Sequence, residues 1–231
     1  MNSISKVLRN LGDAEIAQHS QRFFKTGKGE YGEGDRFLGI RVPVLRQHVR
    51  QCREVDAEEV LKLLASKYHE ERLFALLLLV DKYQRGTDRE KAWIYKHYLA
   101  SSQYINNWDL VDSSADKIVG AHLQQRSHKP LYQLAKSKSL WERRIAIMAT
   151  FHFIRQDDFN DALAICELLI NDEEDLIHKA TGWMLREVGK RDIKAEKAFL
   201  DRHCPAMPRT MLRYAIERFP QAERREYLEC G

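Results

Sequence analysis

The sequence repeats one kind of position at intervals of about 35 residues, and this repetition constrains the fold more than any other feature. Most of these positions carry a cationic side chain, often followed closely by alanine: Arg72, Trp108, Arg144, Lys179 and Arg213. The steps between them are 36, 36, 35 and 34 residues. A period of about 20 to 50 residues is typical of repeat proteins, in which each unit buries its apolar face only against its neighbours.

Helix-start signals accompany the repeats. Thr87-x-x-Glu90 and Ser139-x-x-Glu142 match the capping box, in which a hydroxyl and a carboxylate satisfy free amides of the first turn. The apolar run from Leu73 to Val80 suits a buried helix, and no stretch alternates as a half-buried strand would. The pattern therefore predicts an all-α, HEAT-like helical-repeat solenoid whose second helices line a concave face.

We expect a single domain over residues 1–231. Residues 1–40 would hold N-terminal helices and a glycine-rich loop, residues 41–220 the helical repeats, and residues 221–231 a C-terminal tail. The loop, Gly27–Gly34, lacks the GxxxxGK[ST] pattern and no strand precedes it, so it is not a phosphate-binding loop.

Composition excludes several classes of protein. Hydrophobic residues make up 44% of the chain and charged residues 31%, which is typical of a folded globular protein. No segment reaches the roughly 20 apolar residues of a membrane span, and residues 1–6 lack the apolar core of a signal peptide. Four cysteines have neither metal-ligand spacing nor the pattern of a disulfide framework: Cys52, Cys166, Cys204 and Cys230. We therefore expect a cytoplasmic protein without a metal or another cofactor.

The positive charge is concentrated in one segment. The whole chain carries a formal charge of +4. Between His122 and Arg155, seven basic residues accompany a single acid, Glu142; they are Arg126, Lys129, Lys136, Lys138, Arg143, Arg144 and Arg155. The segment is either a solvated basic face or a surface that binds phosphates.

A candidate site lies in the central segment from Ile105 to Asp112. Trp108 and Asp112 are four residues apart and share one helix face, whereas Asp109 points elsewhere and is expected near the helix start. Trp183 follows Lys179 by the same spacing, so the periodicity allows an indole, a carboxylate, a guanidinium and a second indole to converge. Alternatively, the tryptophans belong to the core and Asp112 pairs structurally with Arg144. The nine histidines form no evident triad or metal signature.

Four motifs together resemble one family. The segments beginning at Arg36 (RFLGIRVP), Asn107 (NWDLVD), Leu140 (LWERRIA) and Lys179 (KATGWMLRE) are similar in order and separation to those of the AlkD family of DNA alkylation repair glycosylases. The resemblance covers about residues 10 to 220. It implies a HEAT-like solenoid that cradles duplex DNA in a basic groove and excises cationic N3- and N7-alkylated purines without a deep base-flipping pocket.

The resemblance also implies roles for individual residues. Asp112 matches the catalytic carboxylate, Trp108 and Trp183 the aromatic pair that contacts the lesion nucleotide, and Arg144 a basic residue that holds the DNA backbone. Phe23 or Phe24 matches a further aromatic residue that can be tyrosine in the family. Lys179 and Arg143 lie in the same motifs and are further candidates for DNA contacts.

The expected partner is double-stranded DNA containing alkylated bases, bound by a monomer that needs no metal or membrane. Two other functions remain open at this stage. One is a HEAT-repeat protein that binds damaged or branched DNA without excision, and the other is a protein-interaction scaffold.

Overall fold

The computed structural model describes residues 3–230, and it is all-α. Met1, Asn2 and Gly231, which belong to the predicted single domain, lie outside the described residues. Within the described part, Arg36 and Tyr68 form an isolated bridge but no strand occurs, as the sequence predicted. None of the described helices is long and apolar enough to cross a membrane.

The chain packs as two compact units, Met1–Ser114 and Ala115–Gly231. The helices of the first unit are α1 (Ser3–Asn10), α2 (Ala14–Phe23), α3 (Val42–Gln51), α4 (Ala57–Leu64), α5 (His69–Arg85), α6 (Asp88–Ala100) and α7 (Trp108–Asp112). Those of the second are the π-helical turn η2 (Asp116–Gly120), α8 (Ala121–Leu123), α9 (Lys129–Ala135), α10 (Leu140–Ala149), α11 (Phe151–Ile154), α12 (Asn160–Leu168), α13 (Asp175–Gly189), α14 (Ile193–His203), α15 (Arg209–Ala215) and α16 (Gln221–Leu228).

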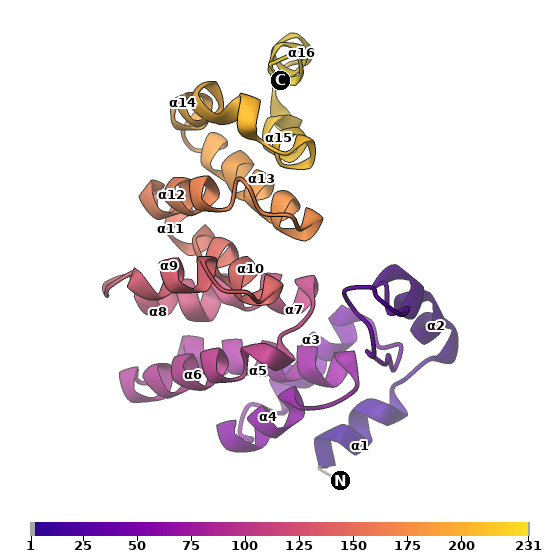
Figure 1. Cartoon of the computed structure of the whole chain (residues 1–231). Helices are drawn as coiled ribbons and strands as arrows, with labels where there is room; N and C mark the ends of the chain where they lie inside the picture. Colours follow the sequence, from indigo (N-terminus) through magenta and orange to yellow (C-terminus); the bar gives the residue numbers. More distant parts are fainter. Residues whose placement is uncertain (1–2, 231) are drawn as a thin grey trace. The chain divides into compact units, whose positions relative to one another are not determined.

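Helix α5 organises the first unit. It contacts α3, α4, α6 and α7, and Figure 1 shows these helices gathered around it. Its apolar run from Leu73 to Val80 is buried throughout, as predicted. The next helix, α6, begins with the predicted capping box, because the amides of Thr87 and Glu90 are bonded to each other's side chains.

The first turn of α5 is charged and yet buried. Glu70 accepts hydrogen bonds from the backbone amides of Leu38, Gly39 and Ile40 at 2.8, 2.8 and 3.2 Å. Glu71 accepts bonds from the hydroxyl of Ser5 on α1 and from Arg9 Nε at 3.1 Å. The positive end of the helix dipole favours both carboxylates, so this turn ties α1 and the segment before α3 to the centre of the unit.

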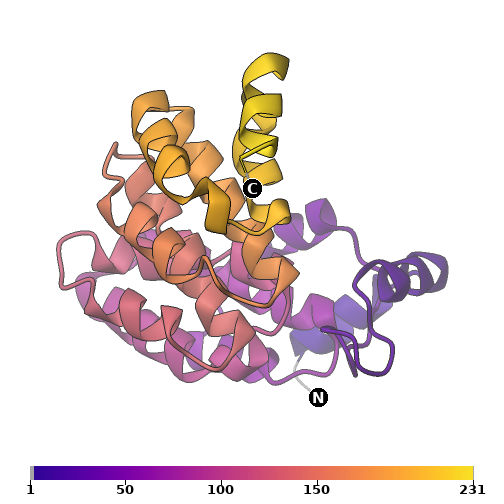
Figure 2. The same ribbon diagram turned by 45° about the horizontal axis from the view of Figure 1, so that its top comes forward.

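The second unit repeats helix pairs. Helix α10 contacts α9 and α13, and α13 contacts α14 and α15, so that successive pairs stack on one another in Figure 1. Figure 2 shows α16, in yellow, beside α15, which it contacts. The segment expected as a C-terminal tail is thus helical from Gln221 to Leu228.

A recurrent helix start defines the repeat register. The side chains of Ser66, Ser137 and Asp172 each accept the amide two residues later, at 3.1, 3.0 and 3.0 Å. Their backbone carbonyls each accept a bond from the side chain six residues later, on Arg72, Arg143 and His178. The residues equivalent to Arg72 are therefore Arg143 and His178. The spacing pattern instead predicted Arg144 and Lys179, one residue later, because neighbouring polar residues cannot be told apart by a period of about 35 residues.

Two glycines bring helices of the second unit into backbone contact. A Cβ atom on Gly182 of α13 would lie 2.3 Å from the carbonyl oxygen of Met211 and 2.6 Å from the Cβ of Tyr214. A Cβ on Gly120 would meet Ala149 and His152 at the same two distances. The same close helix crossing occurs twice in this unit. Its second set of residues, Gly182, Met211 and Tyr214, lies 62 residues after the first set, Gly120, Ala149 and His152.

The spacing of the cysteines indicated no disulfide framework, but one pair of cysteines is bonded. Cys204 and Cys230 are joined by a disulfide, with their Cα atoms 6.3 Å apart. A separation of 26 residues gives no local signal. The bond forms because α16 returns the chain to the end of α14, where Cys204 also contacts the carbonyl of Tyr227. Cys166 is buried, as expected for a core residue.

We predict that Gly182→Ala lowers the free energy of unfolding by about 1–3 kcal/mol, because a methyl group there forces two helices apart. Gly27→Ala is the control, since its methyl group would meet only the movable end of the Glu30 side chain; its change should stay within about 0.5 kcal/mol. Urea denaturation of both variants measures the difference. Equal stability of the two variants would contradict the prediction.

Candidate functional site

The short helix α7 carries two of the predicted site residues in the first unit. Trp108 and Asp112 are its first and last residues, about one helical turn apart. The side chain of Asn107 accepts the amide of Trp108 and begins the helix, while Leu110 and Val111 anchor it in the core. The side chains of Trp108 and Asp112 are both partly accessible to solvent.

Trp108 belongs to a cluster of aromatic rings. Phe24 stacks on Trp108 with ring centroids 5.3 Å apart, and Phe23 meets it edge to face at 6.0 Å. Below them, Phe37 stacks on Phe24 at 5.1 Å. Phe23 is 58% exposed, whereas Phe37 is buried. The cluster therefore rises from the core to the surface, and both phenylalanines considered for the N-terminal aromatic position take part in it.

A buried ionic network lies beneath this cluster. His69 Nε2 is 2.7 Å from Asp109 Oδ2, and His69 Nδ1 is 3.3 Å from Asp35 Oδ2. Arg72 donates to the same oxygen of Asp35 at 2.7 Å. Burial lowers the pKa of His69, but the charge and hydrogen bond of Asp109 and the bond to Asp35 outweigh it and raise that pKa to about 9. Burial raises the pKa of Asp35, and its bonds to His69 and Arg72 bring it below the usual value.

Sequence reasoning missed this network. The histidines formed no evident triad in the sequence, because His69 lies 34 residues from Asp35 and 40 from Asp109. Asp109 does lie near the start of α7, as expected, but its side chain reaches a buried partner. The four charged or ionisable residues from His69 to Arg72, directly before the apolar run from Leu73 to Val80, were the available signal.

The second unit carries the other four predicted site residues, on α10 and α13. Arg144 is buried and donates to the carbonyl of Leu176. Arg143 binds both carboxylate oxygens of Asp172, at 2.6 and 3.2 Å, and two backbone carbonyls. Lys179 pairs with Asp175 at 2.7 Å on the exposed start of α13. Both arginines are therefore engaged within the protein.

Trp183 has its own aromatic surroundings. Its ring lies 6.0 Å from that of Phe151, and its Nε1 donates to Glu187 at 2.9 Å. The guanidinium of Arg155 lies over the ring of Phe151, 3.8 Å from its centroid. The site residues thus form one group in each unit, and the convergence of the two groups stays a prediction.

The basic segment is mostly exposed. Five of its seven cationic side chains face solvent: Arg126, Lys129, Lys136, Lys138 and Arg155. Of these, Arg155 pairs with Asp116 at 2.7 Å. Arg143 and Arg144 instead serve the packing of α10 against the next repeat. An exposed group of cations is available for phosphates.

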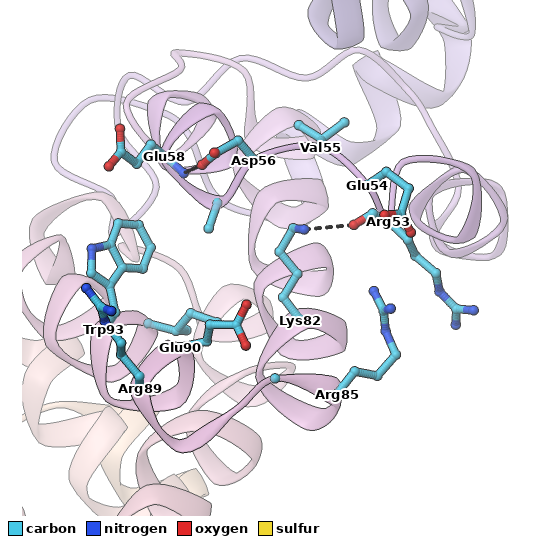
Figure 3. Close-up of a pocket in the computed structure, with 13 residues that line it drawn as sticks. Arg53, Glu54, Val55, Asp56, Glu58, Lys82, Arg85, Arg89, Glu90 and Trp93 are labelled. Carbon is cyan, nitrogen blue, oxygen red and sulfur yellow. Dashed lines mark hydrogen bonds between the residues drawn. The ribbon is translucent and has the colours of Figure 1, made fainter.

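A cavity of about 510 Å³ lies at the C-terminal end of α5, away from His69, and is bordered by α4, α5 and α6. Figure 3 shows Trp93 on one side of it and Lys82 pointing to the carbonyl of Arg53. Arg53 and Arg85 share the carboxylate of Asp81. None of the predicted site residues lines this cavity, and its charges largely satisfy one another. In residues 3–230, no three side chains gather as metal ligands would.

The chain is similar to known proteins over most of its length. The model of the DNA alkylation repair enzyme family matches residues 4–219. A solved structure, a predicted DNA alkylation repair enzyme from Enterococcus faecalis, is 17% identical with a TM-score of 0.69, covering 91% of this chain and 97% of that one. That likeness shows the fold and confirms the helical-repeat prediction. No curated protein matches the sequence significantly.

We predict that stability falls as the pH rises from about 6.5 to 9. The folded chain holds the proton of His69 up to about pH 9, whereas the unfolded chain releases it near 6.5, so the free energy of unfolding decreases by up to about 1.4 kcal/mol per pH unit. Asp109→Asn should flatten this dependence, which urea denaturation at several pH values measures.

A second group lowers stability over an overlapping pH range, so the effect of His69 is the difference between the two proteins. Burial raises the pKa of Glu196 from 4.5 to about 8, which adds the same decline to both proteins and cancels in their difference. Parallel curves for the wild type and the Asp109→Asn variant would contradict the assignment to His69.

Proposed function

Since the chain belongs to the DNA alkylation repair enzyme family, we propose that it is a DNA glycosylase that removes cationic N3- and N7-alkylated purines from duplex DNA. Membership gives the chain a role in the repair of alkylated DNA and implies that it binds DNA. The observation that carries the finer proposal is the pair formed by Trp108 and Asp112, one turn apart and partly accessible beside the aromatic cluster.

The chemistry requires a carboxylate. Alkylation at N3 or N7 makes the purine cationic and weakens the glycosidic bond, so the base leaves with the bonding electrons as a neutral molecule. Positive charge then develops at C1′ of the sugar. Asp112 stabilises this charge electrostatically and orients a water molecule, whose oxygen bonds to C1′ while its proton passes to solvent.

The aromatic side chains would hold the lesion nucleotide. The electron-rich face of an indole attracts cationic groups at about 0.5–2 kcal/mol. Trp108 is fixed by Phe24 and flanked by the exposed ring of Phe23. Phe23 has no hydroxyl, so its contact would be apolar. Trp183, beside Phe151, is the second indole of the proposal.

The proposed substrates are restricted to labile cationic adducts. A neutral lesion needs a general acid to protonate the departing base. Asp109, the carboxyl group nearest to Asp112 in the sequence, is bonded to His69 through one oxygen, and its other oxygen is buried. It therefore cannot serve as that acid. The proposal includes a shallow site in which the lesion stays stacked.

Contacts with the DNA backbone would come from the exposed cations of the basic segment and from Lys179. Arg143 and Arg144 would bind phosphate while keeping their bonds to Asp172 and to the carbonyl of Leu176. In this arrangement the repeats form a HEAT-like solenoid whose concave basic face cradles one duplex, so that a cytoplasmic monomer suffices.

We predict that Asp112→Asn reduces the release of 7-methylguanine or 3-methyladenine from methylated duplex DNA by roughly 100-fold or more, because the amide cannot stabilise a cationic sugar. DNA affinity should be retained. Asp88→Asn, at an exposed carboxylate that begins α6, should leave release unchanged. Undiminished release by Asp112→Asn contradicts the catalytic role, and a wild type that binds but releases nothing favours DNA binding without excision.

We predict that the affinity for duplex DNA falls steeply with salt. Five phosphate contacts correspond to a log–log slope of about −4.5, which is roughly a 500-fold loss between about 50 and 200 mM salt. Neutralising Lys136 and Lys138 to Gln should make the slope less steep by about 2. Lys96→Gln, on the exposed face of α6, is the control. A salt-independent affinity would favour a protein-interaction scaffold.

A further inference from the structure

We propose that His69 is a positioning residue for the reaction proposed above: as an imidazolium held between Asp35 and Asp109, it fixes the first turn of α7 and thereby orients Trp108 and Asp112. The inference rests on the proposed function for its catalytic consequence. Its structural part concerns residues of the first unit only and can be tested without any substrate.

The geometry requires both ring nitrogens of His69 to donate. Nδ1 and Nε2 face carboxylate oxygens of Asp35 and Asp109, at 3.3 and 2.7 Å. A neutral imidazole has one N–H group and an imidazolium has two. Two carboxylates therefore select the cationic form, in a ring that is 1% exposed.

The two carboxylates depend on His69 to different degrees. Asp35 also receives a bond from Arg72 at 2.7 Å. Asp109 has no second partner among the described residues, because its Oδ1 atom is buried without a hydrogen bond. Loss of the proton on His69 would remove the cation that compensates the carboxylate of Asp109, and the one remaining N–H group could serve only one of the two carboxylates. Asp35 keeps its bond from the cationic Arg72, so the loss of charge compensation falls on α7.

Helix α7 is too short to hold its own orientation. Its five residues form too few internal hydrogen bonds for an independent helix. Its first turn is held by the buried side chain of Leu110, by the cap of Asn107 and by the bond between Asp109 and His69, which is the polar anchor beside Trp108. Trp108 precedes Asp109 directly and Asp112 follows three residues later, so a rotation of this turn displaces both side chains.

A second route connects His69 to Trp108. The imidazole lies against two rings that also stack on each other, with centroids 4.9 Å from Phe24 and 4.7 Å from Phe37. Phe24 in turn stacks on Trp108. A cationic imidazole is attracted to these ring faces, so the same proton supports the aromatic cluster.

The charges around His69 balance. The groups that face it are Asp35 from the segment before α3, Asp109 from α7, and Arg72 from its own helix. With His69 cationic, two positive and two negative charges make a neutral network. Because the network is neutral, it neither adds to nor offsets the negative charge of Asp112 that would act on the developing sugar cation.

The structural test follows two resonances of the wild-type protein between pH 6 and 10. Nitrogen-15 spectra identify the ring of His69 by comparison with His69→Gln, and the indole of Trp108 by comparison with Trp108→Phe. We expect both ring nitrogens of His69 to be protonated at neutral pH and the Trp108 indole signal to shift with the same midpoint as the imidazolium. A Trp108 indole signal that does not shift as the His69 imidazolium loses its proton overturns the proposal.

The functional test uses single-turnover base release and duplex affinity. His69→Gln should slow release by between about 10- and 100-fold through misplacement of the reacting groups, while affinity changes less than about threefold. Adding Asp109→Asn removes the uncompensated carboxylate and should restore most of the lost rate. His97→Gln, on α6 beside Trp93, is the matched control and should behave as the wild type.

The outcomes separate the two proposals. A wild type that releases no base overturns the glycosylase assignment, while the two resonances still decide the role of His69. If the wild type is active, an unchanged rate in His69→Gln, or a double variant no faster than His69→Gln alone, overturns the positioning role. A rescue by Asp109→Asn supports it, because the double variant no longer carries the carboxylate charge that His69→Gln leaves uncompensated in the first turn of α7.

Discussion

The first turn of α5 places four consecutive charged or ionisable side chains inside the protein, and the first unit depends on how each is satisfied. His69 reaches Asp109 of α7, Glu70 holds the amides of residues 38–40, Glu71 binds α1, and Arg72 binds Asp35. Removing one member of a buried ionic group costs far more than the group contributes as a whole, because its partner is left charged and dry. The turn therefore specifies one arrangement of these four segments.

This arrangement connects the core with the candidate chemistry. The aromatic cluster begins at Phe37, which is buried, and ends at Phe23, which is exposed. A lesion nucleotide at the surface would contact rings whose positions are set by buried charges. Catalysis by electrostatic stabilisation needs such fixed groups, since a carboxylate that must reorient during the reaction loses its advantage. The second unit offers the exposed cations of the basic segment, which suit binding more than bond breaking.

The sequence predicted the architecture better than the site. The buried run of α5 and the capping box at Thr87 are local patterns, and the structure confirms both. The period near 35 residues recurs in the helix starts at Ser137 and Asp172. The repeat register was wrong by one residue because Arg143 and Arg144 are alike in charge. The network of His69 and the disulfide of Cys204 escaped prediction because their partners are distant in the sequence. The motif around Trp108 drew attention to the helix of the candidate site, but it could not show that Asp109 beside it is bonded to His69.

The glycine crossings in the second unit bear on how such a chain tolerates mutation. Where two helices touch through backbone atoms, their spacing is set by groups that every residue shares. The flanking side chains can then drift widely in identity while the distance between neighbouring helices stays constant. Tolerance to substitution along the repeats is consequently uneven: replacement at the two glycine positions lowers stability, whereas much of the surrounding surface can change.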